Sequence, residues 1–207
     1  MPGVLFEGGS FRAIFSCGVM DALLDQDVMF PYCIGVSAGA ADSASYISQQ
    51  KERNLNMLLQ YRNDKRYMGL RNYFKKEHSL FGVDFVFRKM PNVLFPFDMD
   101  TFQNYAGDYV VVTTDANTGK PHYFHKEDVD DRFDVFCASC ALPVYFQALH
   151  IGGGAYYDGG VSDPVPIRRL QRDGHHKALI VLTRPEGYRK ACGRSDRFAA
   201  GVLRRRY

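Results

Sequence analysis

The chain has 207 residues, of which 46% are hydrophobic and 24% are charged, and its formal net charge at pH 7 is +3. This composition is typical of a globular protein and excludes a largely disordered or fibrous chain. The charge is too small to predict nucleic acid as a partner, and we expect none. A chain of this length can bury a sizeable core in one domain without help from disulfides.

Cysteine usage and the first residues indicate a cytoplasmic protein with reduced thiols. The five cysteines are an odd number and form no dense framework. Cys137 and Cys140 make a single CxxC pair, which favours two small residues on one helix face over a zinc site. The start of the chain lacks the basic and apolar regions of a signal peptide, and no apolar run is long enough to span a bilayer. Any contact with a membrane surface is therefore expected to be peripheral.

Short apolar runs that alternate with helical patterns predict an α/β protein. Residues 4–6 are predicted to form a buried strand, and apolar residues at helical spacing follow between 11 and 24. The run 32–34 is the next predicted strand, and small residues from 40 to 44 begin another helix. Two successive units of strand, glycine turn and helix are typical of a mainly parallel central sheet.

The stretch from 51 to 100 has a different character, because it carries nine Phe or Tyr residues and no long regular period. We expect packed helices here, since aromatic side chains most often fill cores. The alternative interpretation is a cap over an apolar pocket.

The remaining elements are predicted from β-branched content and turn residues. Residues 109–114 form the clearest strand. Asn117, Thr118 and Gly119 predict a hairpin turn into a partner strand. Residues 135–141 are expected to be helical, and 178–182 are expected to form a second buried strand.

Gly35, Ser37 and Gly39 form a GxSxG sequence between the second predicted strand and the helix that follows it. In this context the pattern is typical of a nucleophile elbow, a strained turn that only small neighbours such as Ala38 can flank. The free N–H groups at the start of the helix would face an oxyanion formed at the serine. We therefore predict Ser37 as a nucleophile.

A glycine-containing loop is a candidate for the oxyanion hole that such chemistry requires. Gly8, Gly9 and Ser10 follow the first predicted strand, at the same end of a parallel sheet as Ser37. Ligands of such sheets bind at the carboxyl ends of the strands. A dinucleotide-binding loop is disfavoured, because the segment lacks GxGxxG spacing.

Asp158 precedes Gly159 and Gly160, near the end of a later apolar segment. Taken alone, an aspartate followed by two glycines is the composition of a turn. A turn at a strand end could also bring its carboxylate to the serine, which needs a base to become a good nucleophile. The residues alone leave both interpretations open.

These motifs, in this order, resemble the patatin-like phospholipase family. That family has a glycine-rich loop, then GxSxG, then Asp-Gly-Gly or Asp-Gly-Ala. Residues 138–146 are similar to its Ala-Ser-x-x-x-Pro-x-x-Phe segment, and residues 182–190 are similar to a segment of a bacterial subgroup. The resemblance runs from about residue 3 to 190. It implies a three-layer α/β/α sandwich with a mainly parallel central sheet.

The resemblance also implies roles for individual residues. Ser37 would be the nucleophile and Asp158 the base of a dyad without histidine, metal or cofactor. The positions that match the oxyanion loop and its arginine are Gly8, Gly9, Ser10 and Arg12. The implied activity is hydrolysis of carboxylic esters of phospholipids or related lipids through an acyl-enzyme.

Two residues depart from the family pattern. Ser10 replaces the usual third glycine, and Ala13 replaces the glycine after the arginine. Ser10 would be strained if the loop needs a positive φ there, which would lower activity or narrow the substrate range. We expect a hydrolase domain over 1–190 and a shortened, basic C-terminal tail over 191–207. This tail is predicted to be a solvated end, with attraction to anionic phospholipid as the alternative.

Other function classes remain open. An α/β-hydrolase triad would combine Ser37 with an aspartate and with His175 or His176, although this serine lies early in the chain for such an enzyme. His122 and His125 stand three apart on a predicted strand and point to opposite faces, which does not suit a metal site. A non-catalytic lipid-binding protein with the same fold and an acyltransferase that uses the same acyl-enzyme are the further alternatives.

Overall fold

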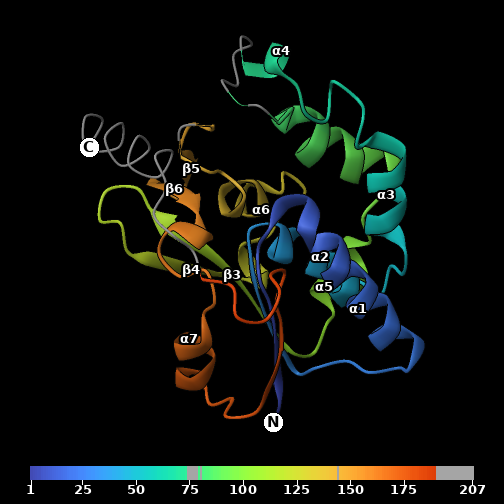
Figure 1. Ribbon diagram of the computed structural model, residues 1–207, viewed down its shortest axis with the longest axis vertical. Coiled ribbons are helices and arrows are strands. Elements are labelled where there is room, and N and C mark those ends of the chain that lie inside the picture. Colours follow the sequence, from blue (N-terminus) through green and yellow to red (C-terminus); the bar gives the residue numbers. More distant parts are fainter. Residues whose placement is uncertain (74–78, 80, 144, 190–207) are drawn as a thin grey trace.

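The computed structural model describes residues 1–73, 79, 81–143 and 145–189 (Figure 1). The expected basic tail, 191–207, lies outside these residues. Over the described ranges the chain forms one central sheet with helices packed on it, and none of these helices is both long and apolar enough to cross a membrane. The predicted α/β architecture is confirmed.

Within the described residues the sheet has seven strands. In chain order they are β1 (Gly3–Phe6), β2 (Tyr32–Val36), β3 (Asp108–Asp115), β4 (Pro121–His125), β5 (Leu149–Ile151), β6 (Gly154–Asp158) and β7 (Ala178–Val181). Strands β7, β1, β2 and β3 run parallel. Strands β4 and β6 are antiparallel to β3, and β5 is antiparallel to β6. The predicted hairpin joins β3 to β4 through Gly119, whose φ is +67°.

Helical segments connect and cover these strands. The α-helices are α1 (Ile14–Asp25), α2 (Ala38–Ile47), α3 (Arg53–Tyr61), α4 (Leu70–Tyr73), α5 (Met99–Gln103), α6 (Asp134–Ser139) and α7 (Ile167–Arg172). Shorter 3-10 turns are η1 (Ser10–Ala13), η3 (Lys126–Asp128) and η4 (Gly159–Val161), and η2 (Phe85–Leu94) is a π-helix that contains Pro91. The helix predicted over 11–24 thus begins as a 3-10 turn, and α1 starts only at Ile14.

Alternate side chains of β1 enter two different hydrophobic cores. Val4 and Phe6 pack with buried residues of α1, α2, α5 and α6. Leu5 packs on the other face with Ile34 and with Leu170 of α7. Because successive side chains of a strand point to opposite faces, two cores mean that helices cover both sides of the sheet. Figure 1 shows α1, α2 and α5 on one side of the strands and α7 on the other, which is the expected three-layer arrangement.

Strand β7 is less buried than its apolar sequence predicts. Leu179 and Ile180 are each 37% exposed, and only Val181 is buried. Within the described residues β7 pairs with β1 alone, so it lies at the edge of the sheet. The predicted strand is formed, but the prediction that it is buried is wrong, because an apolar run does not distinguish an edge position from a central one.

The register of β3 brings the ends of two other strands together. Strands β2 and β4 both pair with Val110–Val112, so they lie on opposite edges of β3. Strand β6 pairs with Thr113–Asp115, a range that overlaps the pairing of β4, and β6 therefore lies on the same edge as β2. Val36 and Asp158, the last residues of β2 and β6, stand opposite successive residues of β3. The turn that begins at Ser37 is thereby placed beside Asp158.

Candidate active site

Ser37 occupies the sharp turn between β2 and α2. Its backbone has φ 54° and ψ −129°, a conformation that is strained for any residue other than glycine. A Cβ at Gly35 would lie 2.5 Å from Ala40 Cα, and a Cβ at Gly39 would lie 2.4 Å from the Phe6 carbonyl oxygen. The two glycines therefore allow the close backbone contacts that hold the turn. This is the geometry expected of a nucleophile elbow.

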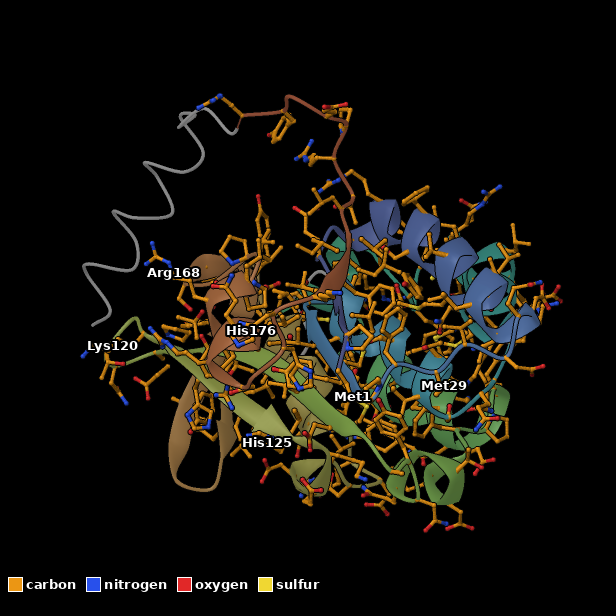
Figure 2. All side chains as sticks on the ribbon, turned by 90° about the horizontal axis from the view of Figure 1, so that it is seen from below. Met1, Met29, Lys120, His125, Arg168 and His176 are labelled. Carbon is orange, nitrogen blue, oxygen red and sulfur yellow. The ribbon has the colours of Figure 1, made fainter. Side chains whose placement is uncertain are left out.

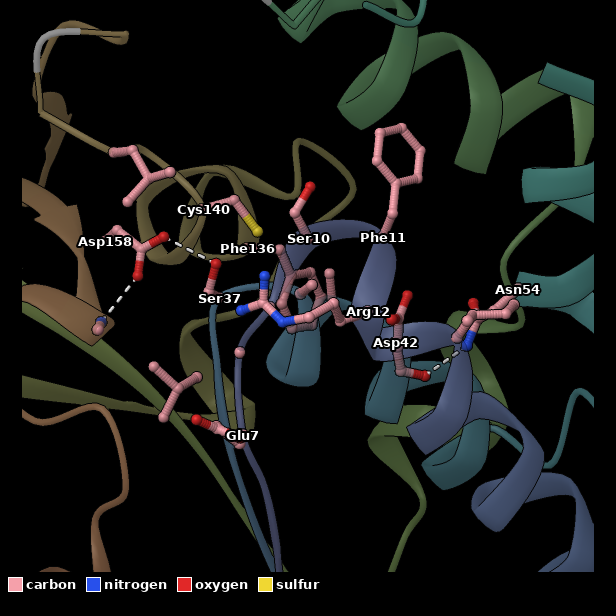
Figure 3. Close-up of a pocket in the computed structure, with 18 of the residues that line it drawn as sticks. Glu7, Ser10, Phe11, Arg12, Ser37, Asp42, Asn54, Phe136, Cys140 and Asp158 are labelled. Carbon is pink, nitrogen blue, oxygen red and sulfur yellow. Dashed lines mark hydrogen bonds between the residues drawn. The ribbon is translucent and has the colours of Figure 1, made fainter. Parts of the chain in front are cut away.

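The Ser37 hydroxyl donates a hydrogen bond to Asp158 Oδ2 at 2.7 Å (Figure 3). The second carboxylate oxygen, Oδ1, accepts a hydrogen bond from the Gly160 N–H at 2.7 Å. The backbone of Asp158 is held as well: its N–H donates to the Ala141 carbonyl at 2.9 Å, and its carbonyl accepts from Thr114 Oγ1 at 2.8 Å. Four hydrogen bonds thus fix the carboxylate against the serine.

The environment of Asp158 changes its acidity. The residue is 2% exposed, and burial raises its pKa to about 6, because a buried carboxylate loses the solvation that stabilises its charge. The hydrogen bonds from Ser37 and Gly160 act in the opposite direction and stabilise the charged form. At neutral pH the carboxylate is therefore largely ionised, yet it is a stronger base than an exposed aspartate.

Cys140 lies beside this pair (Figure 3). Burial, and then the negative charge of Asp158, raise the pKa of its thiol well above the usual value, so the thiol is neutral. Cys140 caps α6 rather than lying within it, whereas Cys137 is inside the helix and in the core. Both side chains pack against the same hydrophobic core, in agreement with the predicted placement on one face, although the helix itself ends at Ser139.

The loop after β1 contacts the serine directly. A Cβ at Gly8 would lie 2.8 Å from Ser37 Cβ, and a Cβ at Gly9 would lie 2.7 Å from Thr183 Oγ1. Thr183, just after β7, donates a hydrogen bond to the Gly8 carbonyl at 2.8 Å. Its N–H donates to Glu7 Oε2 at 2.6 Å. The sequence placed Thr183 only in a segment that matches the family, and gave no sign of this contact with Gly8, 175 residues away along the chain.

The two departures from the family pattern behave differently. Ser10 has a φ of 51°, so the strain expected for a residue other than glycine is present. Ala13 has a φ of −63° and is buried, and it is therefore unstrained. Arg12 is exposed and lines the pocket, with its guanidinium directed towards Ser37 in Figure 3.

Ser139 is part of the site, although the sequence identified it only as a member of a matching segment. Its hydroxyl accepts a hydrogen bond from the Ser37 N–H at 2.8 Å and donates one to the Val112 carbonyl at 2.7 Å. The side chain is fully buried. Through this hydroxyl, α6 ties the elbow to the central strand β3. The N–H of Ser37 is thereby occupied and is not free to stabilise an oxyanion.

A pocket of about 1380 Å³ opens beside Ser37 and Asp158. Helices α1, α2 and α6 contribute one part of its lining. The aromatic stretch contributes another part through Met57, Leu58, Tyr67, Phe81, Val86, Phe87, Pro91 and Phe97. This stretch forms helices, as expected, and it also forms an apolar wall of the pocket, which is the second of its two interpretations.

None of the described histidines lines this pocket. His175 and His176 follow α7, and His175 Nδ1 lies 2.9 Å from the Met1 carbonyl oxygen, before the start of β1. Figure 2 views the molecule from this end, with Met1, His125 and His176 labelled. Ser37 lies at the other end of the parallel strands. A triad through His175 or His176 is therefore not formed.

The part of the chain that the structure describes contains no group of three His, Cys, Asp or Glu side chains able to hold a metal ion. The His122 ring lies 4.6 Å from that of Phe124 and 4.9 Å from that of Tyr156, between ring centroids. His125 Nε2 instead lies 3.5 Å from a guanidinium nitrogen of Arg169 on α7. The two histidines point to opposite faces of the sheet, as predicted.

Comparison with known proteins gives two similarities. Residues 4–170 match the family model described as patatin-like phospholipase. The uncharacterized protein YjjU of Escherichia coli (strain K12) is 27% identical over 186 residues, which cover 86% of this chain and 51% of that relative. The chain therefore spans about half the length of this curated relative.

Replacement of Ser10 by glycine should stabilise the protein. Glycine adopts a positive φ without steric strain, whereas other residues pay roughly 1–2 kcal/mol. We expect the free energy of unfolding of Ser10→Gly, measured by urea denaturation, to rise by about 1 kcal/mol. Ser10→Ala is the matched control, because it removes the hydroxyl and keeps the strain. Equal stability of the two variants would contradict this account.

Ionisation of Asp158 should destabilise the fold. Its folded-state pKa of about 6 lies above the usual 3.8, so the stabilising contribution is complete below pH 4 and is lost as the pH rises through 6. Between pH 4 and 7, Asp158→Asn should therefore gain stability relative to wild type by about 3 kcal/mol. Urea denaturation at several pH values measures this difference, with the exposed Asp100→Asn as control. Parallel pH profiles of wild type and Asp158→Asn would refute it.

Proposed function

The chain belongs to the patatin-like phospholipase family, and we propose that it hydrolyses carboxylic esters of phospholipids or related lipids through an acyl-enzyme. The observation that carries this proposal is the 2.7 Å hydrogen bond from Ser37 Oγ to Asp158 at the wall of a largely apolar pocket. Ester cleavage by a serine requires a base in contact with the hydroxyl, and a lipid acyl chain requires an apolar cavity.

In the first half of the reaction, Asp158 accepts the hydroxyl proton as Ser37 Oγ bonds to the ester carbonyl carbon. The tetrahedral intermediate carries its negative charge on the former carbonyl oxygen. Its collapse breaks the bond to the alcohol oxygen, which takes the proton from Asp158 and leaves. The acyl group stays on Ser37 as an ester.

In the second half, Asp158 accepts a proton from water as the water oxygen attacks the acyl-enzyme. Collapse of this intermediate releases the fatty acid and returns the proton to Ser37 Oγ. A pKa of about 6 suits both halves, because the group is ionised at neutral pH and still basic enough to accept a proton. An alcohol in place of the water would make the same acyl-enzyme an acyltransferase.

Backbone groups of the loop after β1 are the proposed oxyanion hole. Within the described part of the chain, the N–H groups of Gly8 and Gly9 have no hydrogen-bond acceptor. Gly8 is in contact with Ser37, and the Ser37 N–H is itself occupied by Ser139. These observations favour Gly8, Gly9 and Ser10 as donors, with Arg12 adding positive charge nearby. Each donor to a developing oxyanion typically contributes about 3–4 kcal/mol.

The surroundings of the pocket support peripheral contact with a lipid surface. Seven pocket-lining apolar side chains are each at least 36% exposed: Phe11, Ile14, Leu142, Tyr145, Val161, Leu182 and Tyr188. We call them the apolar rim. Arg12 and Arg184 also line this pocket, and they would attract anionic headgroups. The described cysteines carry thiols and not disulfides, which is consistent with a reducing, cytoplasmic compartment.

Loss of either member of the dyad should abolish hydrolysis. Ser37→Ala removes the acyl acceptor and should lose both fluorophosphonate labelling and ester hydrolysis. Asp158→Asn removes the base and should lower kcat by several orders of magnitude, because the hydroxyl is then a poor nucleophile. Steady-state kinetics on lipid esters and mass spectrometry of the labelled serine measure these effects.

Three controls separate the alternatives. Single histidine-to-Gln variants should keep most activity, and a folded histidine variant as inactive as Ser37→Ala would favour a triad instead. Activity should survive exhaustive chelation, because the proposed steps use only a base and backbone donors. If folded wild-type protein is not labelled by fluorophosphonate, the result would favour the alternative of a non-catalytic lipid-binding protein.

The apolar rim should determine vesicle binding. We expect the double variant Phe11→Ser/Tyr145→Ser to bind vesicles of anionic phospholipid at least tenfold more weakly in flotation assays, since two large side chains no longer enter the bilayer interface. The double variant Leu59→Ser/Val93→Ser removes exposed apolar side chains that do not line the pocket, and it serves as the matched control. Equal binding by the two double variants would exclude the rim as the docking surface.

A further inference from the structure

Asp42 is a second carboxyl group in the pocket, and the proposed reaction does not use it. It lies on α2, five residues after Ser37, and it lines the same cavity. Five residues of an α-helix correspond to about 7.5 Å along its axis. In Figure 3 the Asp42 side chain points into the pocket, away from the neighbouring Asn54.

The carboxylate has weak partners among the described residues. Asn54 Nδ2 donates to the backbone carbonyl of Asp42 at 2.8 Å and not to the side chain. The thiol of Cys17 is the hydrogen-bond donor to the carboxylate, and a thiol is a weak donor. Arg53 contributes positive charge nearby, but its guanidinium donates to the Phe95 carbonyl and to Ser45 Oγ. No ion pair between Asp42 and Arg53 is formed.

Most of the pocket lining is apolar, but Asp42 also has polar neighbours: Asn54, and the phenol of Tyr67, whose pKa is raised by burial and then by the charge of Asp42. Met57 and Leu58 of α3, together with Phe97, line the pocket with it. Burial raises the pKa of Asp42 to about 7. A carboxyl in such surroundings does not stabilise the fold, because its desolvation is not offset by a strong partner. A perturbed acid that faces a cavity is instead typical of a group that contacts a ligand.

We propose that Asp42 forms a polar subsite that binds a hydroxyl group on the acyl chain of the ester. The inference deepens the proposed function and rests on it for the position of the scissile ester at Ser37. A hydroxyl donates a hydrogen bond to the carboxylate and accepts one from the protonated form, so it fits either state of Asp42. An ammonium group fits less well, because Arg53 places positive charge near the carboxylate. The preferred substrates are therefore esters of hydroxylated acyl chains.

The distance from Ser37 predicts where the hydroxyl stands. A subsite about 7.5 Å along the helix axis from the serine lies beside the middle of a medium-length acyl chain rather than next to the carbonyl. Apolar side chains occupy the wall around it, so the rest of the chain remains in apolar surroundings. A carboxyl in a mainly apolar pocket discriminates strongly, because an unmodified chain would leave it desolvated with only the weak thiol donor of Cys17.

Competing hydrolysis of esters tests this subsite. The substrates are methyl decanoate and methyl decanoates with a hydroxyl at carbon 2, 5, 6, 7 or 8, and the readout is kcat/KM for each. For wild type we expect at least a tenfold preference for one of the mid-chain isomers over methyl decanoate. Asp42→Leu should lose that preference and favour methyl decanoate. Asp42→Asn, which keeps the shape and an acceptor oxygen, should retain part of it, and the exposed Asp100→Leu should retain all of it.

Equilibrium binding to the Ser37→Ala protein makes the subsite testable without turnover. By titration calorimetry, the best hydroxylated ester should bind at least tenfold more tightly than methyl decanoate, and Ser37→Ala/Asp42→Leu should lose the difference. If the hydroxylated ester binds more tightly but wild type hydrolyses no ester, the proposed function is refuted and the subsite is supported. The subsite would be overturned if wild type and Asp42→Leu showed the same ratio of kcat/KM for hydroxylated esters to kcat/KM for methyl decanoate. It would also be overturned if the preference that depends on Asp42 were for esters with an ammonium group and for no hydroxylated ester.

Discussion

The contact between Ser37 and Asp158 depends on a constraint in the sheet, because two strands of opposite direction end against the same edge of β3. Strand β2 runs parallel to β3 and β6 runs antiparallel to it, so their last residues meet at neighbouring positions of β3. Strand pairing therefore sets the positions of the two residues before their side chains interact. Ser139 adds a further tie, since its hydroxyl joins the elbow N–H to the backbone of β3. A pair held by backbone pairing keeps its geometry without relying on flexible segments.

Two carboxyls, the buried Asp158 and the half-buried Asp42, face the same pocket and differ in what surrounds them. Asp158 accepts hydrogen bonds from Ser37 and Gly160, which offset part of its desolvation and hold its pKa at about 6. Asp42 has a weak thiol donor and a nearby guanidinium, and its pKa is raised to about 7. Both ionise more easily in the unfolded chain, so both reduce stability at neutral pH. The first is hydrogen-bonded to Ser37, whereas the second lines the pocket without a strong partner.

Much of the sheet could be predicted because strand and helix patterns are local. The apolar runs at 4–6, 32–34 and 109–114 all lie within strands, and the glycine turns after the first two lead into helical segments. The exposure of β7 could not be predicted in this way, since it depends on which strands pair beside it. The aromatic stretch 51–100 likewise carries no period that reveals a pocket wall. Its role depends on the elements it faces.

By itself the sequence determined the class of fold and the elbow pattern around Ser37, because these depend on neighbouring residues. It made the strain at Ser10 conditional on a positive φ, which the structure supplies. Only the tertiary structure decided that Asp158 meets Ser37, that Ser139 occupies the elbow N–H, and that Asp42 faces the pocket. Each of these contacts joins segments from different elements. Their distances are set by strand register and helix packing, which no local pattern of residues encodes.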